Sequence, residues 1–310
     1  MNWSVLTIIP KTRLGESLMR TLIKTYTDQV NQQLEKSLPL PEGPAQRLFS
    51  AMRYSIFNGG KRVRPLLCFA AAEAVSTASQ ATAVAAASIE MIHAYSLIHD
   101  DLPAMDNDDL RRGVPTCHVQ YDEATAILAG DALQALAFET LTAIKGPSSE
   151  NTIELLHLLS SLGGCSGMAT GQAIDLASTG QQLSVEQLSL MHQHKTGALI
   201  EASVLMGAIA TGKATPEQCA ALKQFARCIG LAFQIQDDII DIESSTQLLG
   251  KQQGADAANN KATYPSLMGL DAAKEKANSL YTESIDALAI FGDKADPLRT
   301  IARFIINRDY

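Results

Sequence analysis

Apolar residues recur along this chain three and four positions apart, a spacing that places them on one face of a helix. Two series show it: Leu155, Leu158, Leu159 and Leu162, and further along Leu199, Ala202, Leu205 and Met206. No alternating apolar and polar run bounded by turn residues accompanies them, so the pattern does not favour a sheet. The chain is therefore predicted to be helical.

The distribution of proline supports the same conclusion. No proline lies between Pro65 and Pro103, between Pro147 and Pro216, or between Pro216 and Pro265. Because proline removes a helical hydrogen bond and clashes with the preceding turn, long stretches without it favour uninterrupted helices. These stretches are rich in Ala, Leu, Gln and Glu, which have high helix propensity.

Turn-forming residues divide the chain into about ten helical segments. The turns fall at 39–44, 58–60, 112–115, 146–149, 178–180, 211–212 and 249–260. Segments 81–102, 122–145 and 220–243 are apolar nearly all round, which is typical of the central helices of a bundle. Since no linker or repeat marks a boundary, we expect one all-α domain over residues 19–310, a helical bundle around a central cavity. A flexible extension over residues 1–18 is expected before it.

Composition narrows the function. The 310 residues carry a net charge of −8, which argues against a nucleic-acid binder because there is no surplus of basic residues to neutralise phosphates. The five cysteines are odd in number and form no C-x-x-C pair, so we expect reduced thiols and a cytoplasmic protein. The apolar run at 5–9 is too short to span a bilayer and has no charged segment before it. Neither a signal peptide nor membrane insertion is predicted.

A first acidic cluster ends an apolar helix with Asp100 and Asp101 and continues into a turn with Asp106. Carboxylates at the C-terminal end of a helix oppose its dipole, and charge is costly beside apolar residues. A cation offsets both costs, and carboxylate oxygens suit Mg²⁺. Taken alone, the cluster is equally compatible with a solvated acidic turn. An EF-hand is excluded, because Arg111 and Cys117 stand where that loop needs glycine and glutamate.

A second cluster favours metal binding over the solvated turn. Asp237 and Asp241 lie four residues apart, hence on one face of a helix, with Asp238 between them in sequence. Like charges at that spacing are destabilising unless a cation lies between them. A solvated face would not follow the largely apolar run 229–235. The two clusters predict facing walls of one metal-filled cavity.

Basic residues accompany both clusters. They are Lys61, Arg64, Arg111, Arg112, Lys195, Lys251 and Lys261. Gly59 and Gly60 precede Lys61 and permit close approach of the backbone to a ligand, although no Walker loop is present. Each lysine alone is compatible with a surface charge. As a set that alternates with acidic clusters, the cations fit a site for two diphosphates.

The histidines add one candidate. His93 lies seven residues before Asp100, about two helical turns, and therefore faces the same side. It is compatible with a core histidine that makes one hydrogen bond, or with a diphosphate contact. His192 and His194 lack the i, i+4 spacing of a helical metal pair, so no zinc site is predicted.

In this order the segments resemble the trans-prenyltransferase (isoprenyl diphosphate synthase) family, especially its bacterial farnesyl diphosphate synthases. The resemblance covers residues 48–309 and includes the D-D-x4-D pattern of Asp100, Asp101 and Asp106. Its other motifs lie at 59–65, 111–113, 171–175, 195–197, 233–241, 250–251 and 261–265. It implies the isoprenoid synthase type I fold and a homodimer.

The resemblance also implies a set of site residues. An allylic diphosphate would be held through Mg²⁺ (three ions, with Mn²⁺ as a possible substitute) by Asp100, Asp106 and Asp237, supported by Asp101, Asp241 and Asp175. Direct contacts to that diphosphate would come from Arg111, Lys195, Lys251 and Lys261. Isopentenyl diphosphate would be held by Gly60, Lys61, Arg64, His93 and Arg112.

The implied reaction is the head-to-tail (1′-4) condensation of isopentenyl diphosphate with dimethylallyl and then geranyl diphosphate. The allylic C–O bond ionises, the isopentenyl double bond attacks, and a proton leaves to the released diphosphate. Lys195 and Arg111 would stabilise the leaving diphosphate. The dipoles of Thr196 and Gln234 would stabilise the allylic cation, and an apolar cavity would exclude water.

Product length has its own candidate. Tyr95 stands five residues before Asp100, and one helical turn rises about 5.4 Å, close to one isoprene unit. In the farnesyl synthases that the chain resembles, an aromatic residue here closes the pocket. Tyr95 therefore favours a C15 product, (E,E)-farnesyl diphosphate, over the C20 product of a geranylgeranyl diphosphate synthase.

Other functions stay open beside this one. A class I terpene cyclase shares the helical fold but normally replaces the second aspartate cluster, and a non-catalytic synthase subunit typically loses one cluster. A purely structural bundle needs neither. The intact Asp237, Asp238 and Asp241 favour the synthase. The preferred allylic primer is not determined by these residues.

Overall fold

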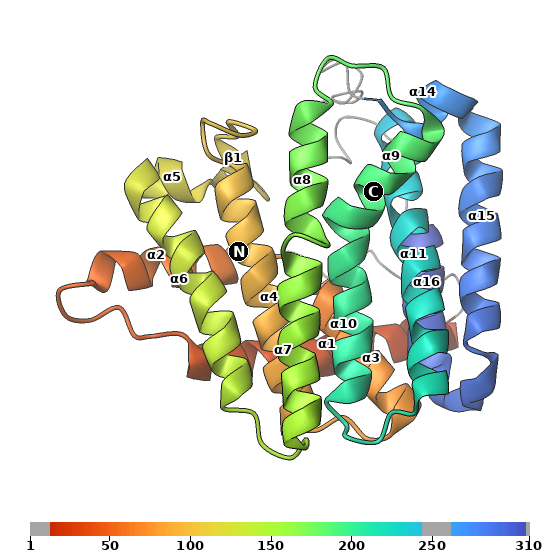
Figure 1. Ribbon diagram of the computed structural model, residues 1–310, viewed down its shortest axis with the longest axis horizontal. Coiled ribbons are helices and arrows are strands. Elements are labelled where there is room, and N and C mark those ends of the chain that lie inside the picture. The colour runs from red at the N-terminus through yellow and green to blue at the C-terminus, as the bar shows by residue number, and fades with distance from the viewer. Residues whose placement is uncertain (1–12, 244–261, 308–310) are drawn as a thin grey trace.

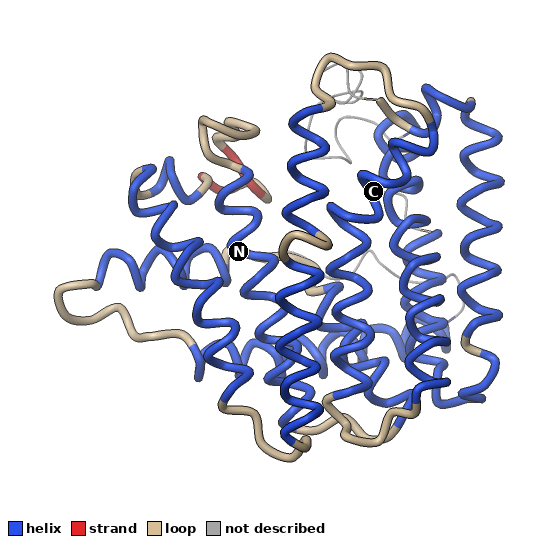
Figure 2. Tube along the Cα trace, viewed as in Figure 1, coloured by secondary structure: helices blue, strands red, loops and turns tan. Residues whose placement is uncertain are grey.

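The computed structural model describes residues 13–243 and 262–307, and within them nearly every element is a helix (Figures 1 and 2). The first four helices are α1 (Arg13–Ser37), α2 (Gln46–Phe57), α3 (Val63–Val75) and α4 (Gln80–Asp100). A hairpin of β1 (Leu110–Arg111) and β2 (Val114–Pro115) follows. The all-α fold predicted from the sequence is confirmed, and the two-residue strands of this hairpin were not predicted.

The remaining helical segments complete the bundle. They are α5 (Cys117–Gln120), α6 (Glu123–Thr142), α7 (Ser149–Gly163), α8 (Met168–Ala177), α9 (Val185–His192), the π-helical turn η2 (Gln193–Gly197), α10 (Ala198–Ile209), α11 (Pro216–Glu243), α14 (Tyr264–Met268), α15 (Leu270–Ala287), the 3-10 segment η3 (Ala289–Ala295) and α16 (Asp296–Ile306). α1 begins at Arg13, within the predicted extension 1–18, whose residues 1–12 lie outside the described residues.

Polar side chains start several helices where the first N–H groups lack helical partners. The Asp122 carboxylate accepts a hydrogen bond of 2.6 Å from the Thr125 N–H at the start of α6. Ser184 and Gln187 exchange side chain–backbone hydrogen bonds of 2.9 and 3.3 Å at the start of α9, which is a capping box. Asp122 is the first residue of the helical segment predicted over 122–145, and Ser184 lies four residues after the turn predicted at 178–180.

α10 is the centre of the bundle. All twelve of its residues are buried, and α3, α4, α7 and α11 pack around it. The contact with α3 is close, because a Cβ atom on Gly207 would lie 2.0 Å from the Cys68 carbonyl oxygen. Figure 1 shows α4, α7, α10 and α11 running alongside one another while α1 crosses them.

The prediction of three central helices is right for α4 and α11 and wrong for α6. α6 buries one face, which includes Ala126, Ala129 and Leu133, but its other face is exposed and carries both apolar and charged residues. Ile127 is 44% exposed and Leu128 is 56% exposed. The apolar composition of a helix does not by itself show whether other helices of the same chain bury all of its faces.

α4 is a core helix despite its length and hydropathy. Among the described residues it is the helix long and apolar enough to cross a membrane, and 83% of its most apolar window is buried within the protein. Residues 81–92 are all buried, and partial exposure begins at His93. The accessible part of α4 is therefore its last two turns, which carry Tyr95 and Asp100.

The segments that carry chemistry meet at one end of the bundle. α4 ends there at Asp100, and α11 runs toward it with Asp237 and Asp241 in its last two turns (Figure 1). α8 continues the direction of α7 after the break at 164–167, and the chain returns through α9 and η2. The β1–β2 hairpin lies beside the end of α4 (Figure 1).

Candidate active site

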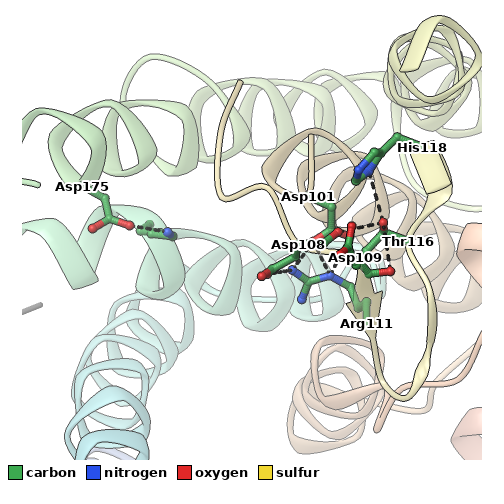
Figure 3. A network of polar contacts seen from close by, with 8 residues as sticks. Asp101, Asp108, Asp109, Arg111, Thr116, His118 and Asp175 are labelled. Carbon is green, nitrogen blue, oxygen red and sulfur yellow. Dashed lines mark hydrogen bonds and ion pairs between the residues drawn. The ribbon is translucent and has the colours of Figure 1, made fainter. Parts of the chain in front are cut away.

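The turn after α4 is closed by an arginine that returns to the helix end. The Arg111 Nε atom lies 2.8 Å from each carboxylate oxygen of Asp101, and its Nη2 atom also donates to Asp101 (Figure 3). Asp108 lies on the other side of the same guanidinium, 3.8 Å from Nη2. Asp101 is 2% exposed, so this is a buried, bidentate ion pair. Burial outweighs the attraction of Arg111 and raises the pKa of the Asp101 carboxyl.

Asp100 has a more accessible and less compensated carboxylate. Burial raises its pKa to about 6; Lys195 opposes this increase, whereas the nearby Asp106 adds to it. Asp106 itself is exposed, and its backbone N–H donates to the Asp100 carbonyl oxygen at 2.8 Å. The structure therefore brings Asp100, Asp101 and Asp106 together at the end of α4, as the sequence predicted.

The second cluster lies on α11. Asp237 is partly exposed, whereas Asp238 and Asp241 are 6% and 4% exposed. The Asp238 carboxylate accepts a hydrogen bond of 2.8 Å from the Tyr264 N–H, at the start of α14. Asp238 therefore links α11 to the start of α14. Asp237 and Asp241, the two residues predicted as ligands, share the face that the sequence assigned to them.

Lys195 and Thr196 lie in the π-helical turn η2 between α9 and α10. The Lys195 ammonium lies 2.5 Å from the Asp175 carboxylate of α8, and its charge also acts on Asp100. Figure 3 shows Asp175 and its ion pair apart from the Asp101–Arg111 cluster. Thr196 on η2 and Gln234 on α11 are both half-buried. Lys195 thus lies between two carboxylates of different helices.

A second group of cations surrounds His93. The Arg64 Nη1 atom lies 3.2 Å from the His93 Nε2 atom. Since arginine only donates, Nε2 must accept, and the imidazole is neutral with its proton on Nδ1. Burial, followed by the charge of Arg64, lowers the pKa of His93 well below its usual value. Lys61 is exposed at the rim, and the buried Arg64 Nε has no hydrogen-bond partner.

The loop that carries Lys61 is held by a pair that the sequence did not single out. Arg62, with a left-handed φ of 49°, donates to Glu90 of α4 at 2.6 Å and to the Ile56 carbonyl at 2.6 Å. Both side chains of the ion pair are buried. The sequence could have indicated this pair, because Glu90 is the one charged residue in the apolar stretch 80–92 and a buried carboxylate needs a partner.

Arg112 connects the hairpin to the same loop. Its Nη1 atom donates to the Gly59 carbonyl and lies 3.2 Å from the Asn58 side-chain oxygen. Arg112 and Gly113 have φ values of 57° and 78°, as a tight type I′ hairpin requires. Adjacent arginines of one hairpin thus point to different partners, Arg111 to the acidic turn and Arg112 to the glycine loop.

The donor set fits Mg²⁺ that is shared with a phosphate ligand. Among the described residues, no group of three or more His, Cys, Asp or Glu side chains is arranged as a complete metal cage. Mg²⁺ typically uses one or two carboxylates and completes its shell with water and substrate phosphates. The raised pKa of Asp100 indicates a carboxylate that a cation would stabilise. Lys251 and Lys261, predicted as diphosphate contacts, lie outside the described residues.

Comparison with known proteins identifies the family of this chain. The model of the family described as Polyprenyl synthetase matches residues 45–289. The chain belongs to the polyprenyl synthetase family. The resemblance drawn from the sequence motifs is confirmed.

The relatives of this chain are named as two kinds of synthase. The farnesyl diphosphate synthase of Haemophilus influenzae is 48% identical over 281 residues, which cover 90% of this chain and 95% of the relative. The chloroplastic geranylgeranyl pyrophosphate synthase of Catharanthus roseus is 47% identical over 285 residues, 91% of this chain and 79% of the relative. Together with the family match they support a prenyl diphosphate synthase, without deciding between the two products.

A solved structure shares the fold. The crystal structure of geranyltransferase from Helicobacter pylori, complexed with magnesium and isoprenyl diphosphate, superposes with a TM-score of 0.79. Its sequence is 36% identical to this one, and the match covers 91% of this chain and 96% of that chain. The two proteins therefore share both the fold and more than a third of their aligned residues.

Proposed function

We propose that this protein condenses isopentenyl diphosphate with dimethylallyl and geranyl diphosphate to form (E,E)-farnesyl diphosphate, releasing diphosphate. The observation that carries the proposal is the separation of the cations into two groups at one end of the bundle. Lys195 pairs with Asp175 of α8 at 2.5 Å, whereas Arg64 contacts His93 at 3.2 Å and Arg112 donates to the Gly59 carbonyl oxygen. The separation of these cations fits two diphosphate ligands that bind at separate places.

In the proposed complex, the acidic side holds the allylic diphosphate. Asp100, Asp106 and Asp237 would hold Mg²⁺ there, with Asp241 and Asp175 in support, as the magnesium in the Helicobacter pylori relative suggests. The ions would neutralise charge that develops on the leaving diphosphate. Arg111 and Lys195 would donate hydrogen bonds to the same group.

Isopentenyl diphosphate would bind on the other side. Lys61, Arg64 and Arg112 supply positive charge, and the Gly59–Gly60 loop lets the backbone approach the phosphates. His93 supports Arg64 through the hydrogen bond at 3.2 Å and contributes no charge of its own, because its ring is neutral. The unpartnered Arg64 Nε supports this assignment, since a buried donor without a partner is costly.

The reaction then has three steps with balanced charge. The allylic C–O bond breaks, and its electron pair leaves with the diphosphate. The isopentenyl double bond forms the new C–C bond to the allylic C1 atom. The new bond leaves a positive charge on the isopentenyl unit, and the carbon next to that charge loses a proton to the released diphosphate. Side-chain dipoles of Thr196 and Gln234 would stabilise the cation, and exclusion of water would prevent its hydrolysis.

The C15 assignment rests on Tyr95. Its ring packs edge-on against the His99 ring, with 5.7 Å between centroids, and its hydroxyl interacts with Gln134 of α6. Tyr95 is therefore held between α4 and α6, one to two turns before Asp100, as a rigid floor would require. A geranylgeranyl diphosphate synthase is the second candidate, because a relative of that name is 47% identical.

The face of α6 with Ile127 and Leu128 supports a homodimer. Two large apolar side chains exposed next to each other on one helix fit a subunit interface. A second copy of this chain is the proposed partner, and the cytoplasmic location predicted from the sequence remains part of the proposal. No nucleic acid or membrane enters it.

The function is tested by incubating the protein with isopentenyl diphosphate, dimethylallyl diphosphate and Mg²⁺ and identifying the prenyl product. We expect farnesyl diphosphate from the wild type, and loss of product in Asp100→Asn and Asp237→Asn. Asp286→Asn, an exposed carboxylate on α15, is the matched control and should retain activity. No condensation by the wild type would refute the function.

Product length is tested separately with Tyr95→Ala and with Tyr95→Phe, which keeps the ring. Tyr95→Ala should extend the product to C20, and Tyr95→Phe should retain C15. A C20 product from the wild type would favour the second candidate. An unchanged product in Tyr95→Ala would show that Tyr95 is not the floor.

A further inference from the structure

Two glycines from different helices press against the π-helical turn η2. A Cβ atom on Gly171 of α8 would lie 2.0 Å from the Lys195 backbone N and 2.4 Å from the Lys195 Cα atom. A Cβ atom on Gly230 of α11 would lie 3.2 Å from the Gly197 Cα atom. The turn is therefore in direct backbone contact with two helices, and only glycine permits the closer of the two contacts.

Each glycine shares a helical face with residues of the candidate site. Asp175 follows Gly171 by four residues, and its carboxylate lies 2.5 Å from the Lys195 ammonium. α8 thus contacts both the backbone and the side chain of Lys195. On α11, Gln234 and Asp237 follow Gly230 by four and seven residues, again on one face.

The contacts have a cost that requires an explanation. Glycine is less favourable than alanine in a helix interior, and Gly171 and Gly230 both lie inside helices. A π-helical turn is also rare and occurs often at functional sites. Both unfavourable features, the helical glycines and the π-helical turn, therefore occur next to Lys195 and Thr196, which η2 carries.

We propose that Gly171 and Gly230 are positioning residues, which seat the π-helical turn between α8 and α11 and so fix Lys195 and Thr196 relative to Asp175 and Gln234. The inference rests on the proposed function, in which Lys195 and Thr196 act on the allylic substrate. A β-carbon at residue 171 would separate α8 from η2 by roughly 1 Å, a misplacement that is enough to reduce catalysis by about 100-fold.

A third glycine provides a matched control. Gly207 of α10 lies equally close to backbone, since its Cβ would be 2.0 Å from the Cys68 carbonyl oxygen of α3. That contact involves no residue of the candidate site. Gly207→Ala therefore introduces the same kind of clash into the same bundle, away from η2.

The test compares Gly171→Ala, Gly230→Ala and Gly207→Ala by steady-state kinetics and thermal unfolding. We expect Gly171→Ala to lower kcat/KM for the allylic diphosphate by about 10- to 100-fold while KM for isopentenyl diphosphate changes less than about threefold. Gly207→Ala should lose thermal stability without either kinetic change. Equal kinetic losses in Gly171→Ala and Gly207→Ala would overturn the proposal.

Gly230→Ala tests the positioning role if Gly171→Ala does not fold. Its contact of 3.2 Å requires a shift of only a few tenths of an ångström, so the variant should fold and still lose several-fold in allylic kcat/KM. Wild-type kinetics in Gly230→Ala would then overturn the inference.

A second measurement separates this inference from the proposed function. Mg²⁺ with inorganic pyrophosphate should raise the unfolding temperature of the wild type and of Gly207→Ala, but much less that of Gly171→Ala or Gly230→Ala. A wild type that forms no product but shows this pattern would refute the proposed function and retain the positioning role. No shift with pyrophosphate in the wild type, together with no product, would refute both.

Discussion

Arg112 lies directly against Gly60. A Cβ atom on Gly60 would be 2.7 Å from the Arg112 Nη1 atom and 2.8 Å from its Cζ atom, and the same Nη1 donates to the Gly59 carbonyl. The hairpin that follows the first acidic cluster is thereby joined to the loop that precedes α3. The Arg112 guanidinium therefore holds the glycine loop of the proposed isopentenyl diphosphate site, while the preceding Arg111 pairs with Asp101.

Gly60→Ala is predicted to weaken isopentenyl diphosphate binding. The added Cβ displaces Arg112, and the φ of +121° at Gly60 is one that alanine rarely adopts. We expect KM for isopentenyl diphosphate to rise roughly tenfold, which corresponds to about 1.4 kcal/mol, with a smaller change for the allylic substrate. Gly43→Ala is the control, because Gly43 also has a positive φ of +70° but a Cβ atom there would meet no other atom within 4 Å. Similar kinetics in both variants would contradict the prediction.

Asp101→Asn is predicted to destabilise the protein more than Asp108→Asn. Both carboxylates contact Arg111, but Asp101 is buried and bidentate, whereas the Asp108 side chain is 53% exposed at 3.8 Å. Loss of the buried partner leaves a poorly solvated charge, at a cost of about 2–4 kcal/mol. Loss of the exposed partner should cost less than about 1 kcal/mol. Urea unfolding measures both, and equal losses would show that the ion pair is not the stabilising contact.

The sequence identified the parts of this fold that depend on composition and spacing. Helical periodicity and the absence of proline predicted the bundle, and the spacing of Asp237 and Asp241 placed them on one face of α11. The exposed face of α6 was missed because periodicity does not show what covers a helix. The π-helical turn was missed because no local pattern of residues marks an i, i+5 turn; its close neighbours Gly171 and Gly230 come from two other helices.

The partners of the buried charged residues in the site were not predicted from the sequence. Asp101 was expected to support metal binding, and the structure pairs both of its oxygens with Arg111. Arg62 lies between two predicted site residues, yet its partner Glu90 is distant in sequence and becomes evident only when α3 and α4 pack together. The sequence identifies the charged residues of a site, but which of them form pairs depends on distances in the folded protein.

His192→Gln is predicted to reduce the loss of stability in acid. His192 stacks against Tyr264, with 5.9 Å between ring centroids, and burial lowers its pKa to about 4. Between its ordinary pKa of 6.5 and about 4, the unfolded chain binds a proton that the folded protein does not. The free energy of unfolding therefore falls as the pH falls, by about 2 kcal/mol for this group between pH 7.5 and 5.

The measurement is urea unfolding of the wild type and His192→Gln at pH 7.5 and pH 5. The difference between the two pH values should be smaller in the variant by about 2 kcal/mol. His157→Gln replaces an exposed histidine of α7 and should retain the wild-type dependence. If His192→Gln loses as much stability in acid as the wild type, protonation of His192 is not responsible.

Charges placed on the outer face of α6 are predicted to prevent self-association. Ile127 and Leu128 are adjacent, exposed and apolar, and the buried face of the same helix packs against α4. Because an uncompensated carboxylate is costly inside an interface, Ile127→Glu with Leu128→Glu should convert a dimer into a monomer that keeps its helical content. Light scattering after size exclusion gives the mass. Ile290→Glu, at a residue that is 52% exposed on η3, should leave the dimer intact. A dimer that survives the α6 charges would place the interface elsewhere, and a monomeric wild type would refute the homodimer.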